Sequence, residues 1–373
     1  MHRLVRKPRL TVAGLAAVVI AAGALVAAGA ASSASQNSYS VHNLVSDQSG
    51  VADTTDPNLV NSWGIAASST SPWWVADNGT DVSTLYNGDG VPQPAGNPLV
   101  VSVDGGPTGI VFNGSSGFVV SDGNGHSGPS IFMFATEAGT IRGWNPNVPP
   151  PVPPATRSTQ SFVVVDKTGE NAVFKGLAIA GDRIYAADFH NAKVDVFDSS
   201  FNQITGGFVD PTLPAGYAPF GIQAIGGSIF VTYALQDATA HDEVDGPGLG
   251  IVDQYSTDGT LIARVSQHGN LNAPWGMAMA PADGFGIASG DLIVGNFGDG
   301  RINTYSQTKS GRWKWEGQLR GTNGRRLTID GLWGIGFGNG SGSGDTNDLY
   351  FAAGPDDEQH GLFGEIAAVS GVG

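Results

Sequence analysis

Histidines with a carboxylate close by in the sequence are the residues of this chain best suited to metal chemistry. Six histidines lie beyond residue 34, and four of them have an Asp or Glu within four residues: His126, His190, His241 and His360. Imidazole nitrogens bind zinc, and neighbouring carboxylates orient such ligands. Since no His-Glu-x-x-His motif is present, a zinc site formed by these residues would have to be assembled from separate segments, and the alternative is that these polar residues cap tight turns.

Asp and Asn residues at the ends of apolar segments offer a second kind of cation site. Their oxygen atoms could form a cage for calcium, although the chain has no EF-hand loop. Such residues also cap tight turns by accepting backbone N–H bonds, and this alternative stays open for each of them. The candidates for ligand binding are Asp77, Asp122, Asp188, Asn191 and Asn296.

Four bulky aromatic residues stand directly before a glycine near the start of a short apolar segment: Trp63, Phe220, Trp275 and Trp333. They could stack on a flat ligand such as a sugar, or they could pack against one another as core. Nucleophilic catalysis has no comparable signal. No Gly-x-Ser-x-Gly elbow stands between a strand and a helix, and no phosphate-binding glycine loop is present.

The same glycines belong to a repeat that positions these residues. Six short apolar segments each have a glycine as the second residue: Gly64, Gly109, Gly176, Gly221, Gly276 and Gly334. A second apolar segment follows each, expected at 73–77, 117–122, 183–188, 228–233, 291–296 and 349–353. Each unit can hold four short strands, which predicts an all-β, six-bladed β-propeller with four-stranded blades. Glycine would allow six inner strands to crowd around one channel.

The two ends of the repeat region predict how the ring closes. The segment 362–369 is the third strand of the last unit, and too few residues follow it to form a fourth strand. The alternating segment 39–45 precedes the first unit, and we expect it to pair with the last blade and remove an exposed edge. Residues 35–373 then form a single domain, with a proline-rich surface loop at about 145–160.

Propeller geometry would bring the candidate residues to one face. The connection into each inner strand and the loop between the second and third strands emerge on the same side of a blade, beside the channel. The aromatic residues fall in the first set of connections, and the acidic and histidine residues fall in the second. We therefore expect an acidic channel mouth that carries histidines.

Residues 1–34 have the arrangement of a secretory signal peptide, with four basic residues before an uncharged apolar stretch and small residues at its end. An uncleaved membrane anchor is the alternative. Cleavage would leave 14 of the 18 Lys and Arg against 33 Asp and Glu. So acidic a surface repels phosphate groups and disfavours nucleic acid and anionic membranes as partners. Since the chain has no cysteine, it forms no disulfides. We expect a secreted monomer that has no membrane span after residue 34, because no segment there is long and apolar enough to cross a membrane.

The segment 184–197, IYAADFHNAKVDVF, resembles an NHL repeat, in which an apolar strand, Asp, a short polar loop and a basic residue precede a strand ending in an aromatic residue. The segments 61–66, 290–300 and 362–364 resemble a family of exported bacterial β-propellers with no established function. The resemblance implies the propeller fold and is silent about chemistry.

Together these observations favour an exported scaffold that binds a small molecule, a metal ion, or an extracellular protein or glycan. The alternative is a calcium- or zinc-dependent hydrolase, lactonase or lyase at the channel mouth, with Asp188, His190, His241 and His360 as ligands or bases. A structural role in a cell wall or matrix is a third possibility. The sequence leaves open whether the protein is an enzyme and which metal, calcium or zinc, it would hold.

Overall fold

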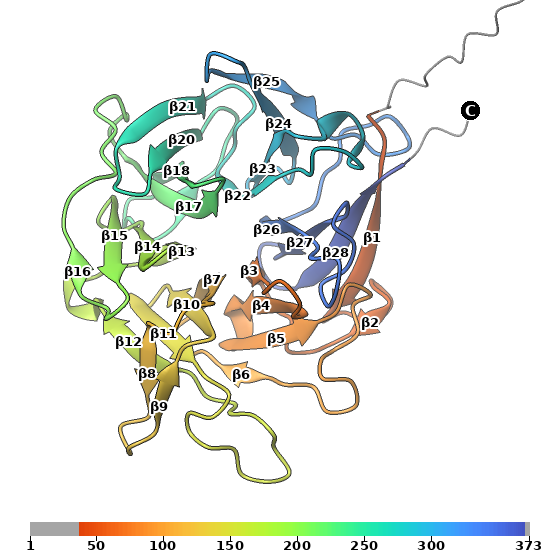
Figure 1. The fold of residues 1–373 in the computed structure, drawn as a ribbon. Coiled ribbons are helices and arrows are strands. Elements are labelled where there is room, and N and C mark those ends of the chain that lie inside the picture. The colour runs from red at the N-terminus through yellow and green to blue at the C-terminus, as the bar shows by residue number, and fades with distance from the viewer. Residues whose placement is uncertain (1–36, 370–373) are drawn as a thin grey trace, which may run out of the picture. The chain divides into compact units, whose positions relative to one another are not determined.

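The computed structural model describes residues 37–369, whose regular secondary structure is almost entirely β-strand (Figure 1). Six sheets stand around a common axis, which confirms the predicted six-bladed propeller. The helical segments of this part are three 3-10 helices, η1 (Asn78–Thr80), η2 (Thr168–Glu170) and η3 (Gly286–Ala288). None of its helices is long and apolar enough to cross a membrane. The segment 1–34, predicted to be a signal peptide, lies outside the described residues.

Each blade runs from an inner strand at the axis to an outer strand at the rim. Blade 1 contains β3 (Ser62–Ala66), β4 (Trp73–Asp77), β5 (Val82–Tyr86) and β6 (Val101–Ser102). Blade 2 contains β7 (Pro107–Phe112), β10 (Phe132–Thr136), β11 (Thr140–Trp144) and β12 (Phe162–Asp166). Blade 3 contains β13 (Phe174–Ala180), β14 (Arg183–Asp188), β15 (Lys193–Asp198) and β16 (Gln203–Ile204).

The second half of the ring repeats this order. Blade 4 contains β17 (Tyr217–Ile225), β18 (Ser228–Gln236), β20 (Ile251–Ser256) and β21 (Leu261–Gln267), with β19 (Glu243–Val244) beside β18. Blade 5 contains β22 (Pro274–Met279), β23 (Leu292–Asn296), β24 (Ile302–Gln307) and β25 (Trp313–Gln318). Blade 6 contains β26 (Leu332–Phe337), β27 (Leu349–Ala353), β28 (Leu362–Ala368) and β1 (Tyr39–Ser46), with β2 (Thr54–Thr55) beside β1. We call the face where the inner strands begin the mouth face, and the other the opposite face.

The six repeated glycines let neighbouring inner strands approach closely at the axis. A Cβ atom added to Gly109 would lie 2.1 Å from the backbone nitrogen of Leu177, and one added to Gly221 would lie 2.1 Å from the carbonyl oxygen of Trp275. No side chain fits at such distances. The predicted crowding of the inner strands is therefore confirmed, and the backbones themselves narrow the channel.

The core lies between the blades. Six of the seven buried hydrophobic clusters each join two neighbouring blades, and the seventh lies at the axis. Because each blade buries both faces of its sheet against its neighbours, the ring is stabilised as one unit.

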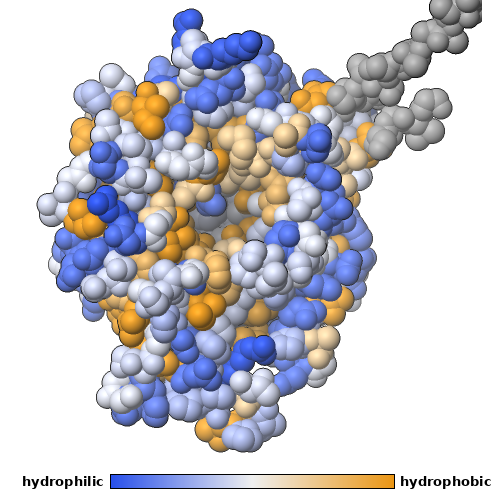
Figure 2. All heavy atoms as spheres, in the orientation of Figure 1, coloured by the Kyte–Doolittle hydropathy of each residue, from blue (hydrophilic) through white to orange (hydrophobic). Residues whose placement is uncertain are grey.

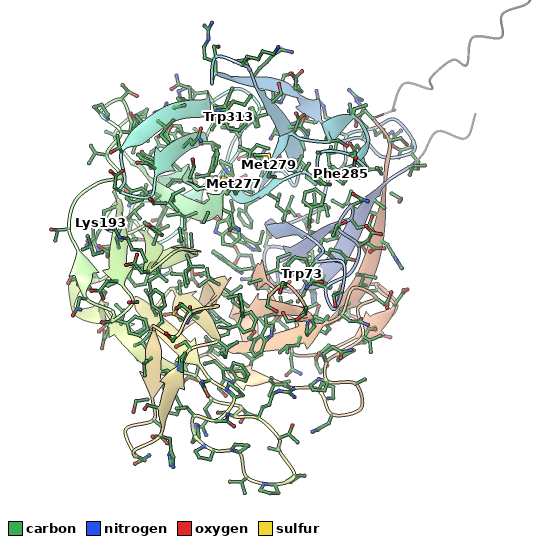
Figure 3. All side chains as sticks on the ribbon, viewed as in Figure 1. Trp73, Lys193, Met277, Met279, Phe285 and Trp313 are labelled. Atoms are coloured by element: carbon green, nitrogen blue, oxygen red, sulfur yellow. The ribbon has the colours of Figure 1, made fainter. Side chains whose placement is uncertain are left out.

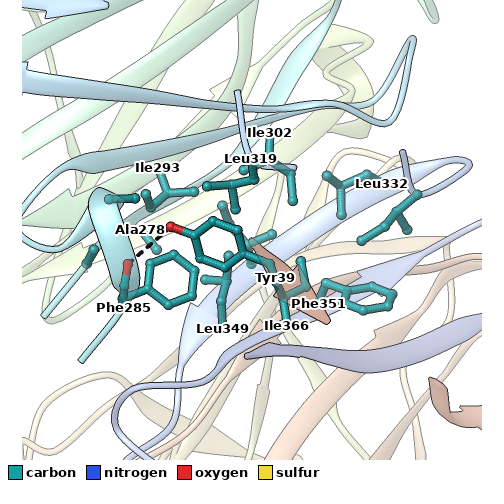
Figure 4. Close-up of a cluster of buried hydrophobic side chains, with 14 of the residues drawn as sticks. Tyr39, Ala278, Phe285, Ile293, Ile302, Leu319, Leu332, Leu349, Phe351 and Ile366 are labelled. Atoms are coloured by element: carbon teal, nitrogen blue, oxygen red, sulfur yellow. Dashed lines mark hydrogen bonds between the residues drawn. The ribbon is translucent and has the colours of Figure 1, made fainter. Parts of the chain in front are cut away.

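Strand β1 closes the ring as predicted. It pairs antiparallel with β28, from Tyr39 opposite Ala368 to Ser46 opposite Leu362. Tyr39 also reaches blade 5, where its hydroxyl donates a hydrogen bond to the carbonyl oxygen of Phe285 at 3.1 Å (Figure 4). The N-terminal strand thus covers the edge of blade 6 and contributes to the core between blades 5 and 6.

Blade 2 departs from the sequence prediction. The segment expected to be its second strand forms instead a hairpin, β8 (Val119–Ser121) and β9 (Ser127–Pro129), between the inner strand β7 and the second strand β10. The reason is that residues 132–136 are fully buried beside β7, whereas Val119 and Ser121 are exposed. Asp122 and His126 consequently lie on the opposite face, and the loop of blade 2 on the mouth face carries Glu137 instead.

Candidate functional site

The aromatic residues that precede the inner-strand glycines close the channel at the mouth face. Trp63, Phe220, Trp275 and Trp333 are at most 8% exposed. Trp63 and Trp333 stack with their ring centroids 3.5 Å apart, and Trp275 meets both rings edge-on. The side chains therefore pack against one another, as the core alternative predicted, and they form a floor beneath the surface of the mouth face.

Lys175 lies directly on this floor and is the only charged residue among the six that precede the repeated glycines. Its side chain is 1% exposed, and its ammonium nitrogen lies 5.1 Å from the centroid of the Trp63 ring. The nitrogen donates hydrogen bonds to Glu137 Oε1 at 2.5 Å and to Asp242 Oδ1 at 3.0 Å. Burial alone would lower the pKa of Lys175, but the surrounding carboxylates raise it above its usual value, so the group stays charged.

Two further carboxylates complete the group around Lys175. Burial, opposed by Lys175, raises the pKa of Glu243 to about 7, and Glu358 and Asp242 add to the increase. Burial also raises the pKa of Glu358, against the effect of its hydrogen bond from Asn61 Nδ2 at 2.6 Å. Glu137, Asp242, Glu243 and Glu358 come from blades 2, 4 and 6, so the fold concentrates negative charge around one ammonium group. We call these five residues the Lys175 cluster.

Asparagines connect the Lys175 cluster to the aromatic floor. Asn61, which precedes β3, accepts a hydrogen bond from Trp333 Nε1 at 3.2 Å and donates to Asn78 Oδ1 at 3.2 Å. Asn78 in turn donates to Glu137 Oε2 at 2.8 Å. Trp63 Nε1, although buried, has no hydrogen-bond partner among residues 37–369. The network fixes Glu137 from two sides, through Lys175 and through Asn78.

His241 stands at the open side of the Lys175 cluster. Its Nδ1 lies 2.9 Å from Asp242 Oδ1, and the side chains of His241 and Asp242 are 49% and 62% exposed. One ligand atom each from Glu137, His241 and Asp242 lies within 4.8 Å of the others. One nitrogen and two carboxylate oxygens at this separation can bind a single divalent ion. Burial would raise the pKa of Asp242, but the positive charge of Lys175 acts against it, and the pKa of this carboxyl lies below its usual value.

The four histidines predicted to share one zinc site do not come together. His126 pairs with Asp122 at 2.6 Å on the opposite face. His190 Nδ1 lies 3.2 Å from the carbonyl oxygen of Ala240, and His360 Nδ1 lies 2.8 Å from Asp47 Oδ2, next to the outer strand of blade 6. His126 is on the other face because blade 2 departs from the predicted strand order, and the loops that carry the other three histidines share the mouth face but end at different distances from the axis. Of the four, only His241 belongs to a group with metal-binding geometry within residues 37–369.

The predicted Asp and Asn ligands mainly brace turns. Asp77 is fully buried and accepts a hydrogen bond from Thr84 at 2.8 Å, and its pKa is raised by burial. Asp188, also fully buried, accepts from Asn191 Nδ2 at 2.8 Å. Asn296 donates to Asp299 Oδ1 at 2.9 Å and to the carbonyl oxygen of Asn270 at 2.9 Å. Asp188 has the turn-capping form that was the alternative to ligand binding, since its Oδ1 also accepts the backbone N–H of Asn191 at 3.2 Å. Asp77 does not, because Thr84 lies on the neighbouring strand and Asp77 Oδ1 has no hydrogen-bond partner among residues 37–369.

The channel is open on the opposite face. A hollow of about 430 Å³ is lined by the ends of the inner strands, including Ile110, Met279 and Phe337. Figure 2 shows this hollow surrounded by largely hydrophobic side chains, and Figure 3 places Met277, Met279 and Trp73 beside it. Among the residues that line this hollow, Gln223 has the one amide side chain, and the others have hydrophobic side chains apart from Gly336. The two ends of the channel thus differ, one charged and closed by aromatic rings, the other apolar and open.

Two viral proteins are similar to most of the chain. Uncharacterized protein R648 of Acanthamoeba polyphaga mimivirus is 35% identical over 345 residues, covering 88% of this chain and 80% of that one. Uncharacterized protein L690 of the same virus is 34% identical over 345 residues, covering 88% and 86%. No protein-family model matches the chain.

Several solved structures have a similar fold at low sequence identity. A glucose dehydrogenase has a TM-score of 0.52 at 14% identity, covering 88% of this chain and 100% of that one. The soluble aldose sugar dehydrogenase of Escherichia coli has a TM-score of 0.51 at 13% identity, covering 89% and 100%. A streptogramin B lyase has a TM-score of 0.50 at 11% identity, covering 89% and 97%. Such likeness shows the propeller fold alone.

Proposed function

The chain belongs to the family of the mimivirus proteins R648 and L690. We propose that it is an exported β-propeller that binds a divalent metal ion at its channel mouth. The observation that carries the proposal is the group formed by Glu137, His241 and Asp242, whose ligand atoms lie within 4.8 Å of one another. Calcium prefers oxygen ligands only, whereas zinc and similar transition metals accept imidazole together with carboxylates. The histidine therefore favours a zinc-type ion.

The charge around this group supports a cation as ligand. Four carboxylates of the Lys175 cluster face one ammonium group, so the cluster carries excess negative charge even while Glu243 holds a proton. Lys175 holds Glu137 and Asp242, which come from different blades, beside each other. In this proposal Lys175 is a positioning residue, and Glu137, His241 and Asp242 are the ligands.

Export is the second part of the proposal. It is supported by the four basic residues and the uncharged stretch within residues 1–34. An acidic protein that binds a metal ion outside the cell would act as a scaffold for that ion or for a small molecule or partner held through it.

A metal-dependent hydrolase or lyase is the second candidate function. The observation that favours it is the exposure of His241 and Asp242, at 49% and 62% of their side-chain surface. Ligands on the open side of an ion leave a coordination position that a substrate or water can reach, as in catalytic rather than structural zinc sites.

Calorimetric titration of the full chain with zinc chloride, and separately with calcium chloride, tests the proposal. We expect one zinc ion per chain and weaker or absent calcium binding. His241→Ala should lower zinc affinity at least about tenfold, because one of three ligands is lost. If zinc does not bind, or binds His241→Ala as tightly as the wild type, the proposal is wrong.

His126→Ala is the matched control. His126 is 49% exposed like His241 and also holds an aspartate through Nδ1, but it lies on the opposite face. Zinc affinity should not change in this variant. Hydrolysis of ester and lactone substrates by the zinc-loaded protein, and its loss in His241→Ala, would separate the catalytic candidate from the binding scaffold.

A further inference from the structure

A second pocket, distant from the Lys175 cluster, lies between blades 1 and 2. It has a volume of about 400 Å³, which is within the range of small-molecule sites. Trp74, Phe132 and Trp144 form its apolar wall: Trp74 stacks on Phe132 with centroids 4.3 Å apart and lies 4.6 Å from Trp144. We call it the aromatic pocket. The three rings are at most 3% exposed and belong to the core between blades 1 and 2, so they form a rigid apolar floor that a flat ligand would contact only at their outer edges.

Two long connections complete the walls of the aromatic pocket. The β5–β6 connection contributes Gln93, Pro94 and Leu99, and the β11–β12 connection, yellow-green at the bottom of Figure 1, contributes Pro146 and Arg157. A neighbouring cavity of about 240 Å³ shares Pro94, Leu99 and Arg157 with it. Arg157 therefore stands where the two cavities meet.

The segment that carries Arg157 is firmly anchored. The next residue, Ser158, donates its backbone N–H to the carbonyl oxygen of Pro146 at 2.8 Å and accepts a hydrogen bond from Trp144 Nε1 at 2.8 Å. Ser102 donates to the carbonyl oxygen of Thr159 at 2.9 Å, which ties the same segment to blade 1. The pocket is thus held open by the fold, and a ligand need not order these connections to bind.

Arg157 has no carboxylate partner. It is exposed, and no Asp or Glu oxygen among residues 37–369 lies within 4.0 Å of its guanidinium. In a chain with 33 Asp and Glu against 18 Lys and Arg, an arginine at the edge of a pocket without a carboxylate is a free receptor for an anion. The other polar side chains of the pocket, Ser71 and Gln93, are neutral.

We propose that the aromatic pocket binds a small molecule with a flat apolar body and a single anionic group, such as an aryl carboxylate. The body packs against Trp74, Phe132 and Trp144, and the carboxylate pairs with Arg157. One guanidinium fits one anionic group, and the net negative charge of the chain repels larger polyanions. The volume holds a small molecule and excludes a folded partner.

Calorimetric titration with 2-naphthoate and with neutral 2-naphthalenemethanol tests the proposal, because the two share the same ring system. EDTA is present throughout, so the result does not depend on the proposed metal site. We expect one naphthoate per chain, bound at least about tenfold more tightly than the alcohol. Arg157→Gln should remove this difference, lowering naphthoate affinity about tenfold while the affinity for the alcohol changes less than about twofold.

Two variants check the location. Gln93→Trp fills the pocket and should abolish binding of both compounds, with the melting temperature showing that the variant is folded. Arg312→Gln removes another exposed arginine without a carboxylate partner, in the β24–β25 turn, and should change neither affinity. The proposal is overturned if naphthoate does not bind, if Arg157→Gln weakens both compounds equally, or if folded Gln93→Trp still binds naphthoate.

Discussion

Trp63 and Trp333 stack face to face at the axis of the propeller, with centroids 3.5 Å apart and ring planes 16° apart. Trp63 lies on the first inner strand and Trp333 on the last, so this contact joins the two ends of the ring. A Cβ atom on Gly334, beside Trp333, would lie 2.5 Å from the carbonyl oxygen of Trp63. Side-chain stacking and backbone approach therefore close the ring at the same point.

Trp333→Ala should destabilise the protein by roughly 3–5 kcal/mol, the usual cost of removing a buried aromatic side chain. Trp333 is fully buried and contacts Trp63, Phe220, Trp275 and Phe297, so the cavity left behind lies at the centre of the ring. Urea unfolding measures the effect. Trp315→Ala, at a residue 44% exposed on β25, should cost less than about 1 kcal/mol. Equal losses in both variants would contradict a structural role for the floor.

Lys175→Met should destabilise the protein most at alkaline pH. The variant leaves Glu137, Asp242, Glu243 and Glu358 without their buried counter-charge, and removing one partner of a buried pair costs roughly 3–5 kcal/mol. At pH 4 Glu243 and Glu358, whose pKa values are raised by burial, bind protons and the repulsion falls, so the loss should be smaller than at pH 8. Thermal unfolding in metal-free buffer at both pH values measures it.

Lys314→Met is the control for this variant. Lys314 pairs with Glu316 at 2.9 Å but is 65% exposed, so its loss should change stability by no more than about 1 kcal/mol. A Lys175→Met variant as stable as the wild type at pH 8 would show that the Lys175 cluster needs no internal cation.

The repeat made the fold predictable, because one physical requirement, glycine where inner strands crowd, recurs in every blade. Blade closure by β1 was predictable for the same reason, since one strand was missing from an otherwise regular series. Blade 2 was not, because the apolar residues 118–120 and 132–136 both suit a strand, and only burial beside β7 distinguishes them. Because of this error, Glu137 was not among the residues predicted for the site. The NHL resemblance stays a prediction.

Outside blade 2, the sequence predicted on which face each candidate residue lies, but not how far from the axis it lies. Lys175 had a visible signal, as the one charged residue among the six before the repeated glycines. His241 and His360 both lie in loops of the mouth face, yet one reaches Asp242 at the axis and the other turns to Asp47 at the rim. The sequence does not contain that distance, because it depends on how far each loop folds over its own blade.

Removal of residues 37–46 should abolish the compact monomer. Without β1, the edge of β28 is exposed, and the core between blades 5 and 6 loses Tyr39. Size-exclusion chromatography should show aggregates for a chain that begins at Asp47, compared with one that begins at Asn37. Tyr39→Phe keeps the strand and loses only the hydrogen bond to Phe285, so it should remain monomeric and lose about 1 kcal/mol. A monomeric, folded truncation would show that β1 is dispensable.

Asp291→Asn should stabilise the protein at pH 8 and have no effect at pH 4. Burial, together with the nearby carboxylate of Glu316, raises the pKa of Asp291 to about 6, whereas an unfolded aspartate titrates near 3.9. The folded state therefore holds the proton more tightly than the unfolded state does, and stability falls as the pH rises from about 4 to about 6. Asparagine keeps the shape without the charge, so the gain at pH 8 should be on the order of 2 kcal/mol.

Urea unfolding at pH 4 and pH 8 measures this difference, with Asp182→Asn as the control in the exposed turn between β13 and β14. The control should leave stability unchanged at both pH values. Lower stability of Asp291→Asn at pH 8 would mean that the ionised carboxylate makes favourable contacts that outweigh its burial, because only then would removal of the charge weaken the folded state.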